Sequence, residues 1–317
     1  NGFEGLIDGS ISEMQWMSVD GWAPQGGSEL GTNRCIPTEE ELPLVAKHLR
    51  AKKINGLLMI GGWDGYMAAH YLHSRRDEYP EFNIPIICMP ATINNNLPGS
   101  EISIGSDTAL NTIMDAVDKI KHSAVASRRV FVVEVMGRYC GYLALLSALS
   151  TGAERAYLHE EGVSLKDLQE DIDTLVKGFK SGKRLGLMIR NENVNEFYSA
   201  DFMRSIFEQE GQGLYDVRRA ILGHQQNGGD PSPFDRIQAN RLAKRCMELL
   251  FGEAAKQNPK SHMCGLTDGQ VKFHPLEKFY EMIDKELQRP QFQWWLKIRP
   301  VAKTLASEDT ALEYTEL

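Results

Sequence analysis

This chain lacks the sequence marks of secreted, membrane-spanning and zinc-binding proteins. Its five cysteines, Cys35, Cys88, Cys140, Cys246 and Cys264, include no Cys-x-x-Cys pair. An odd, unpatterned set is typical of reduced thiols. No apolar run approaches the roughly 18 residues that a membrane helix needs, and no signal-peptide pattern is present. We therefore expect a cytoplasmic protein that does not bind membranes.

The chain also lacks an excess of positive charge. Its 35 lysines and arginines stand against 43 aspartates and glutamates, a net charge of −8, which argues against a general nucleic-acid binder. The histidines show no metal-ligand spacing, and there is neither a Gly-x-x-x-x-Gly-Lys-Ser/Thr loop nor a nucleophile elbow. An anionic substrate would need a local basic cluster, so arginines inside glycine-rich motifs are the residues of interest.

Strand-like and helix-like segments alternate along the chain. Its 317 residues suit two lobes of about 150 residues each. Continuous apolar strands separated by helices predict an α/β protein with doubly wound, mostly parallel sheets. Residues 253–268 are predicted to form a surface excursion. The chain opens without a methionine, and we expect it to be a fragment or a processed piece. Strands are predicted at 56–60, 84–89, 130–135, 185–190 and 219–223, and helices at about 38–53, 65–75, 107–122, 164–180, 202–211 and 235–250.

Three glycine-rich loops follow predicted strands, where ligands of parallel sheets bind. Adjacent glycines in the loop 61–65 let backbone amides approach a phosphate, although such a pair equally often makes only a tight turn. In the loop 136–142, Arg138 is either a phosphate clamp or a surface arginine. The loop 223–236 is dense in polar donors, and its end is predicted to cap a helix at Asp235.

Together these motifs resemble the ATP-dependent 6-phosphofructokinases of the phosphofructokinase A family, over essentially the whole chain. The likeness is closest to the C-terminal half of the long, duplicated, eukaryotic-type enzymes, and it includes Arg190-Asn191-Glu192 and Trp294-Trp295-Leu296-Lys297. The motifs that carry it are residues 2–6, 26–34, 92–96, 105–112, 136–141 and 223–236.

The resemblance implies two three-layer αβα lobes with mostly parallel sheets, with fructose phosphate between them and ATP on the first. Lobe 1 would comprise residues 1–105 plus 226–285, and lobe 2 residues 106–225 plus 286–317. The first strand of lobe 1 and its nucleotide turn would be missing from this chain, which would expose a sheet edge. The family transfers the γ-phosphoryl group of MgATP to the 1-hydroxyl of fructose 6-phosphate.

The chain departs from the family at the positions that carry this chemistry. The family loop Thr-Ile-Asp-Asn-Asp is here Thr-Ile-Asn-Asn-Asn, which places Asn94 at the catalytic base and Asn96 at the second aspartate. An amide hydrogen-bonds a sugar hydroxyl but cannot take its proton. Losing a general base alone typically costs about 10²–10⁴ in rate.

The nucleotide loop and the phosphate clamp depart as well. In the nucleotide-loop remnant Gly61, Gly62, Trp63 and Asp64, the tryptophan stands at the magnesium-binding aspartate and Asp64 comes one residue late. Asn227 replaces an arginine that grips the 6-phosphate. We expect no catalytic residue, metal or cofactor in this half, although the whole enzyme would use MgATP.

In the duplicated enzymes the C-terminal half resembles a converted active site that binds fructose 2,6-bisphosphate. Arg129 and Arg218 match arginines that reach in from a neighbouring half. The expected partners are therefore fructose phosphates, the N-terminal catalytic half, and neighbouring subunits in a homo- or hetero-oligomer, expected to be a tetramer. The carried-over site comprises Arg34, Thr92, Ile93, Asn94, Asn95, Asn96, Arg129, Met136, Gly137, Arg138, Glu192, Arg218, His224, Gln225, Gln226, Asn227 and Arg289.

Two alternatives stay open. The chain is either a working kinase with atypical loops, using Asp64 for magnesium and another base, or a purely structural half that holds catalytic halves in register.

Overall fold

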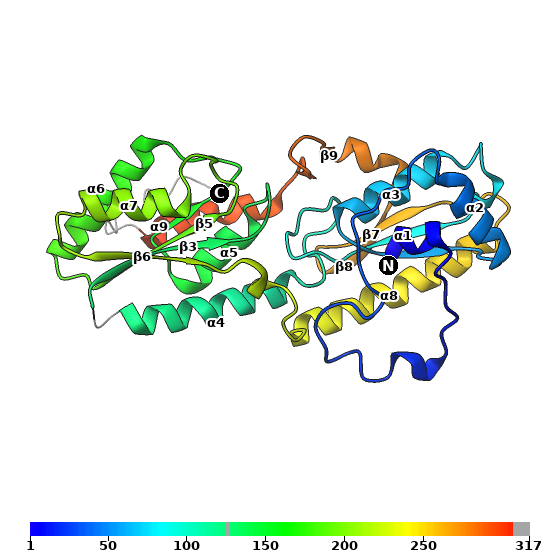
Figure 1. The fold of residues 1–317 in the computed structure, drawn as a ribbon, viewed down its shortest axis with the longest axis horizontal. Helices are drawn as coiled ribbons and strands as arrows, with labels where there is room; N and C mark the ends of the chain where they lie inside the picture. Colours follow the sequence, from blue (N-terminus) through cyan, green and yellow to red (C-terminus); the bar gives the residue numbers. More distant parts are fainter. Residues whose placement is uncertain (125–126, 307–317) are drawn as a thin grey trace. The chain divides into compact units, whose positions relative to one another are not determined.

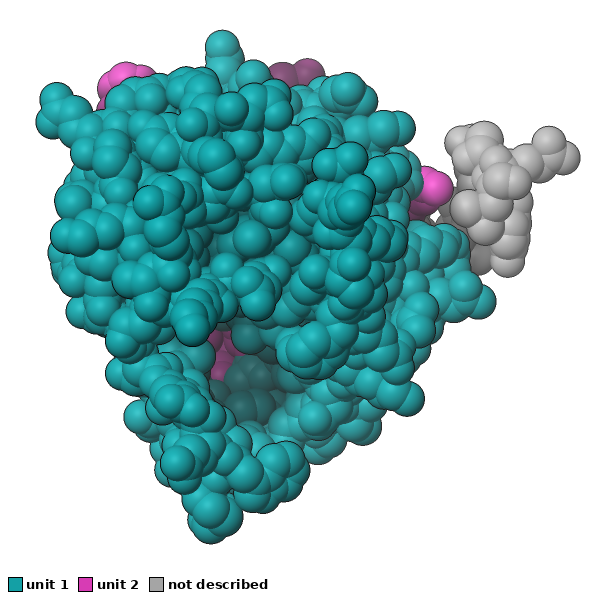
Figure 2. Space-filling model, turned by 90° about the vertical axis from the view of Figure 1, so that its right-hand side faces the viewer, with its two compact units in different colours: residues 1–108, 227–292 teal, residues 109–226, 293–317 magenta. Residues whose placement is uncertain are grey.

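The computed structural model describes residues 1–124 and 127–306. It divides into two compact units, coloured separately in Figure 2. Unit 1 comprises Asn1–Thr108 and Asn227–Phe292, and unit 2 comprises Ala109–Gln226 and Gln293–Leu317. Residues 307–317, which the predicted lobe 2 includes, lie outside the described residues.

Unit 1 is built on a four-stranded sheet in the order β1-β2-β7-β8 (Figure 1). The strands are β1 (Leu57–Gly61), β2 (Ile86–Pro90), β7 (His262–Thr267) and β8 (Gln270–Pro275). β1, β2 and β7 run parallel, and β8 returns antiparallel to β7. No described strand pairs with the outer side of β1, which is therefore an edge of the sheet.

Helices cover both faces of this sheet. On one face lie α1 (Gly2–Asp8), α2 (Leu42–Ala51) and α3 (Trp63–Ser74), which pack with Ile86 and Cys88 of β2. On the other face α8 (Pro233–Ala254) packs with Ile87 and Met89 of the same strand. Successive side chains of a strand point to opposite faces, so the unbroken apolar run of β2 serves both cores.

Unit 2 is built on an all-parallel sheet in the order β4-β5-β3-β6. Its strands are β3 (Arg129–Val135), β4 (Arg155–Tyr157), β5 (Leu185–Asn191) and β6 (Asp216–Ile221). α6 (Leu165–Lys180) and α7 (Ala200–Glu210) share a buried cluster with Val130 and Val132. The unit also contains α5 (Tyr142–Thr151) and α9 (Arg299–Ala306), while α4 (Ser106–Ala124) begins in unit 1 and continues into unit 2.

Short elements complete the chain. The strands β9 (Ile283–Asp284) and β10 (Arg289–Pro290) form a small antiparallel pair. The 3₁₀ helices are η1 (Trp16–Val19), η2 (Pro80–Phe82), η3 (Gly223–Gln226), η4 (Leu276–Glu281) and η5 (Trp294–Ile298). Within the described ranges, no helix has the length and apolarity needed to cross a bilayer.

The α/β class with mostly parallel sheets is confirmed, and two local predictions are wrong. Residues 253–268 do not form a surface excursion, because β7 lies inside the sheet with Met263 and Cys264 buried. The helix predicted from residue 38 begins only at Leu42. Glu41 does accept the backbone N–H of Thr38 at 2.8 Å, so the predicted capping residues close a turn before the helix.

Candidate functional site

The candidate residues of unit 2 gather at the carboxyl ends of its strands. Met136, Gly137 and Arg138 follow β3, Glu192 follows β5, and His224, Gln225 and Gln226 lie in η3 after β6. Because these three strands are parallel and adjacent, their carboxyl ends meet at one edge of the sheet, where α/β proteins bind ligands. His224 and Gln225 are exposed, whereas Gln226 is buried.

Two side chains from neighbouring strands hold the loop after β3. Gln226 Oε1 accepts the backbone N–H of Met136 at 3.2 Å. Glu192 Oε1 accepts the N–H groups of Gly137 at 3.1 Å and Arg138 at 2.7 Å. Gln226 also donates through Nε2 to the carbonyl of Gly223 at 3.0 Å, so its amide joins two loops from inside the protein.

The loop has a backbone that few residues adopt. Gly137 has φ +142°, and a Cβ there would lie 2.4 Å from the carbonyl oxygen of Cys140 and 2.8 Å from Nδ2 of Asn191. Arg138 has φ +50°, a left-handed conformation uncommon for a non-glycine residue. Asn191, which is fully buried, donates through Nδ2 to the same Cys140 carbonyl at 3.0 Å. The loop is therefore fixed before any ligand arrives.

A buried ion pair lies on the adjacent strands. Arg190 of β5 pairs with Glu134 of β3, its partner in the sheet register. Burial raises the pKa of Glu134 and lowers the pKa of Arg190, and each partner's charge opposes the shift of the other. The pair lies two residues before Met136 and Glu192 and joins the two strands that lead to the site.

Arg129 and Arg218 lie away from this cluster. Arg129 begins β3, and Arg218 is the third residue of β6, in register with Phe131. Both are near the amino ends of their strands and on the same face. Seven residues of strand separate Arg129 from Met136, about 20 Å at 3.3 Å per residue. One copy of unit 2 therefore does not bring these two arginines to Arg138.

The asparagine-rich loop 92–96 of unit 1 has a partly exposed part and a buried part. Thr92, Ile93 and Asn94 are partly exposed, and Thr92 Oγ1 accepts the N–H of Asn94 at 3.3 Å. Asn95 and Asn96 are buried. Asn95 binds the carbonyl of Glu101 and the N–H of Ser103, and Asn96 donates to the carbonyl of Gln288. Both buried amides thus hold the protein's own backbone, which leaves Asn94 as the accessible amide.

The loop after β1 has become part of the core. Gly61 ends β1, Gly62 is the N-cap of α3, and Trp63 is only 7% exposed, with its ring 5.6 Å from that of Phe279. Asp64 lies in the first turn of α3, where a carboxylate favours the helix dipole. No described cluster of three or more histidine, cysteine, aspartate or glutamate side chains can hold a metal. A buried indole at the metal position does not fit magnesium-bound ATP.

The remaining candidates of unit 1 lie in separate segments. Arg34 is exposed and makes no ion pair with any described residue, Arg289 is on β10, and Asn227 is exposed after η3. Two glycine motifs do meet, because a Cβ on Gly26 would lie 2.5 Å from the carbonyl oxygens of Gly228 and Gly229. At the end of that loop the N-cap of α8 is Ser232, whose Oγ accepts the N–H of Asp235 at 3.1 Å, so the cap lies three residues before the predicted Asp235.

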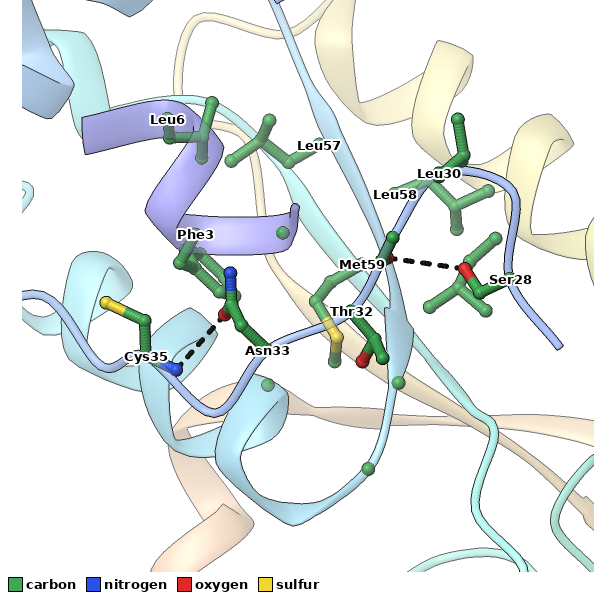
Figure 3. A pocket seen from close by; sticks show the side chains of 16 residues that line it. Phe3, Leu6, Ser28, Leu30, Thr32, Asn33, Cys35, Leu57, Leu58 and Met59 are labelled. Carbon is green, nitrogen blue, oxygen red and sulfur yellow. Dashed lines mark hydrogen bonds between the residues drawn. The ribbon is translucent and has the colours of Figure 1, made fainter. Parts of the chain in front are cut away.

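A pocket of about 380 Å³ lies along the open edge of β1 (Figure 3). Phe3 and Leu6 of α1 form one wall, the segment 28–35 crosses it, and Leu58 and Met59 of β1 form the other wall. None of its lining residues is lysine or arginine, so it does not suit a phosphosugar. Of the sequence candidates it includes only Gly61 and Gly62.

The predicted site does not include Asn191, the last residue of β5, which holds the loop after β3. Gln226, Asn95 and Asn96, which the prediction places in the ligand site, each bind backbone groups in this structure.

Comparison with known proteins places this geometry in a family. The phosphofructokinase family model matches residues 1–250. The chain belongs to the phosphofructokinase family. It is 44% identical over 309 residues to the ATP-dependent 6-phosphofructokinase of Dictyostelium discoideum, covering 96% of this chain and 37% of that protein. It is 41% identical over 326 residues to the human platelet-type enzyme, covering 100% of this chain and 42% of that protein.

Solved phosphofructokinases share the fold. The structure of the Saccharomyces cerevisiae enzyme superposes with a TM-score of 0.92 at 33% identity, covering 96% of this chain and 43% of that chain. The chain thus spans less than half the length of these relatives, and the predicted resemblance to the long phosphofructokinases is confirmed.

Proposed function

We propose that this chain is the C-terminal, effector-binding half of an ATP-dependent 6-phosphofructokinase. The whole protein would convert ATP and fructose 6-phosphate into ADP and fructose 1,6-bisphosphate in glycolysis. This half would bind a fructose bisphosphate activator, fructose 2,6-bisphosphate, without transferring a phosphoryl group. A cytoplasmic location belongs to the same proposal, and it agrees with five cysteines that are all free thiols.

The observation that carries the proposal is the burial of Trp63. Phosphoryl transfer depends on positioning and on neutralising charge with magnesium. The position that holds the family's magnesium carboxylate carries an indole packed on Phe279, and the base position carries Asn94. Neither side chain takes a proton from a sugar hydroxyl or binds a cation through oxygen anions.

Binding is supported by the loop after β3. Arg138 supplies a planar, permanently charged donor suited to phosphate, and its backbone is already fixed by Glu192. In the same unit, Glu192 offers an acceptor to a sugar hydroxyl. Arg129 and Arg218, at the opposite end of the sheet from Arg138, would complete the same site in a neighbouring half. The proposed site is therefore completed by assembly with the N-terminal half or another subunit.

The test is a calorimetric titration of fructose 2,6-bisphosphate into the full-length protein that carries this chain. We expect micromolar binding that Arg138→Ala abolishes, with no turnover from the isolated chain supplied with MgATP and fructose 6-phosphate. Turnover by the isolated chain would favour the working kinase. This is the second candidate, because the Asp64 carboxylate has no hydrogen-bond or ion-pair partner among the residues that the structure describes. A well-folded protein that binds no fructose phosphate would favour the purely structural half.

A further inference from the structure

The loop after β3 uses three successive backbone N–H groups, those of Met136, Gly137 and Arg138, as donors to side chains. Successive N–H groups that converge in this way form a concave anion site, or nest. Here the nest at Gly137 and Arg138 holds a carboxylate of the protein itself, that of Glu192, and both contacts go to the same oxygen, Oε1.

The second carboxylate oxygen of Glu192, Oε2, does not take part in these contacts. Within the described ranges Oε2 accepts no hydrogen bond, and the backbone N–H of Glu192 donates to the carbonyl of Val135 at 2.9 Å. The residue is partly exposed at the carboxyl end of β5. One oxygen is thus committed to the protein, and the other is left for a ligand hydroxyl.

We propose that Glu192 is a positioning residue for Arg138, in addition to any contact that it makes with a sugar. This inference rests on the proposed function for its ligand, a phosphosugar bound through Arg138. Glu192 Oε1 holds the N–H of Arg138 while that residue keeps φ +50°. The left-handed conformation is unfavourable for a residue with a Cβ, so it persists only where neighbouring groups enforce it.

The backbone conformation of Arg138 also determines where its guanidinium group lies. The backbone at Arg138 fixes the direction in which its side chain leaves the loop. A small rotation there moves the end of a long side chain by several times the displacement of its Cα. Gly137 cannot enforce the conformation, since it has no side chain of its own. The Glu192 carboxylate therefore ties the Arg138 backbone to the end of β5, beside the anchors that Gln226 and Asn191 give the same loop.

A positioning role and a simple sugar contact predict different results with a ligand that has no hydroxyl-bearing ring. Inorganic phosphate has nothing for a sugar-reading carboxylate to bind. If Glu192 only reads hydroxyls, its removal leaves phosphate affinity unchanged. If it positions Arg138, its removal weakens phosphate and the fructose bisphosphate alike.

The experiment compares Glu192→Ala and Glu192→Gln with the parent protein. Inorganic phosphate and fructose 2,6-bisphosphate are titrated into the full-length protein, and hydrogen exchange is followed for the segment 136–141 without ligand. We expect Glu192→Ala to weaken both ligands at least tenfold and to speed exchange in this segment at least tenfold. Glu192→Gln keeps an acceptor oxygen for the two N–H groups, so its exchange and its phosphate affinity stay within about threefold of the parent.

The matched control is Asp167→Ala. Asp167 Oδ2 also accepts two donors, the N–H and hydroxyl of Ser164 at 2.8 and 2.6 Å, but at the start of α6. It should lower stability without changing phosphate affinity or exchange at 136–141.

Unchanged phosphate affinity in Glu192→Ala overturns the positioning role, whether or not exchange becomes faster. Loss of the bisphosphate with phosphate retained assigns Glu192 to sugar reading only. If the parent binds neither ligand, the proposed function fails, and unchanged exchange in Glu192→Ala would then overturn the anchoring of the loop separately.

Discussion

The loops after β1 and β3 start alike and end differently. Each follows a parallel strand and places a glycine before a large side chain, Trp63 in one case and Arg138 in the other. The tryptophan turns inward onto Phe279, and its loop becomes core. The backbone around Arg138 is held by Glu192, which follows β5 and binds the N–H of Arg138, and by Gln226 of η3, which binds the N–H of Met136. One glycine-containing loop thus contributes a side chain to the core, while the other has a backbone fixed by side chains of the protein.

Replacing Trp63 disrupts the packing of the loop after β1 and should have the largest effect on stability. Trp63→Ala removes a buried aromatic side chain, which costs about 3–5 kcal/mol of unfolding free energy. Urea unfolding followed by circular dichroism measures the loss. Trp16→Ala is the control, because Trp16 is 90% exposed and a surface change stays within about 0.5 kcal/mol. Equal stability of the parent and Trp63→Ala would show that the indole is not a core residue.

Replacing Gly137 disrupts the backbone of the loop after β3. Gly137→Ala places a Cβ against the Cys140 carbonyl and Asn191, so the loop must move. We expect a loss of about 1–3 kcal/mol in stability and at least tenfold weaker binding of fructose 2,6-bisphosphate by calorimetry. Gly182→Ala tests backbone strain alone, since Gly182 has φ +104° with no atom within 4 Å of its Cβ position. Binding at the parent affinity in Gly137→Ala would mean that the loop geometry is irrelevant to the ligand.

Acid should weaken unit 1 through four histidines that are buried or partly buried. Burial lowers the pKa of His70, His73, His262 and His274. The unfolded chain therefore binds more protons, and stability falls as pH decreases from about 6.5, the unfolded value. Unfolding free energies measured between pH 7.5 and 5 should decline, and His73→Gln should flatten the decline. The exposed His122→Gln is the control, and a pH-independent parent would contradict the prediction.

Restoring a carboxylate at position 94 should have the smallest effect of these substitutions. Asn94→Asp returns the family's base to a partly exposed position, but the loop after β1 still offers an indole in place of a metal ligand. Production of ADP from MgATP and fructose 6-phosphate should stay at background in a coupled assay. Measurable turnover in this single variant would revive the working-kinase interpretation.

Two strands of unit 2, β3 and β5, could be predicted because their apolar runs are long and continuous, whereas β4 was not predicted and β6 spans Asp216–Ile221 instead of the predicted 219–223. Residues 130–135 and 185–190 differ from β3 and β5 by a single residue at one end. β7 was missed because its run Met-Cys-Gly-Leu shows no alternation of apolar and polar residues and contains no β-branched side chain. Its place inside the sheet depends on pairing with β2, a contact distant in sequence.

The identities of the site residues follow from the family motifs, but their directions do not. Whether Trp63 faces a ligand or the core depends on where Phe279, more than two hundred residues later, packs. The inward turn of Gln226 likewise depends on a partner in another loop. The separation of Arg129 from Arg138, in contrast, follows from strand direction alone, since they flank opposite ends of one strand.

The open edge of β1 affects the tendency of the isolated chain to aggregate. Leu57 donates to the carbonyl of Pro85 and Gly61 accepts from Ala91, so the alternating residues Leu58 and Ile60 direct their backbone groups outward. Ile60 is 53% exposed. An uncovered, aliphatic strand edge is a template for another strand. Solutions of the isolated chain should therefore become turbid through aggregation as concentration and time increase. The substitution Ile60→Lys should prevent this turbidity.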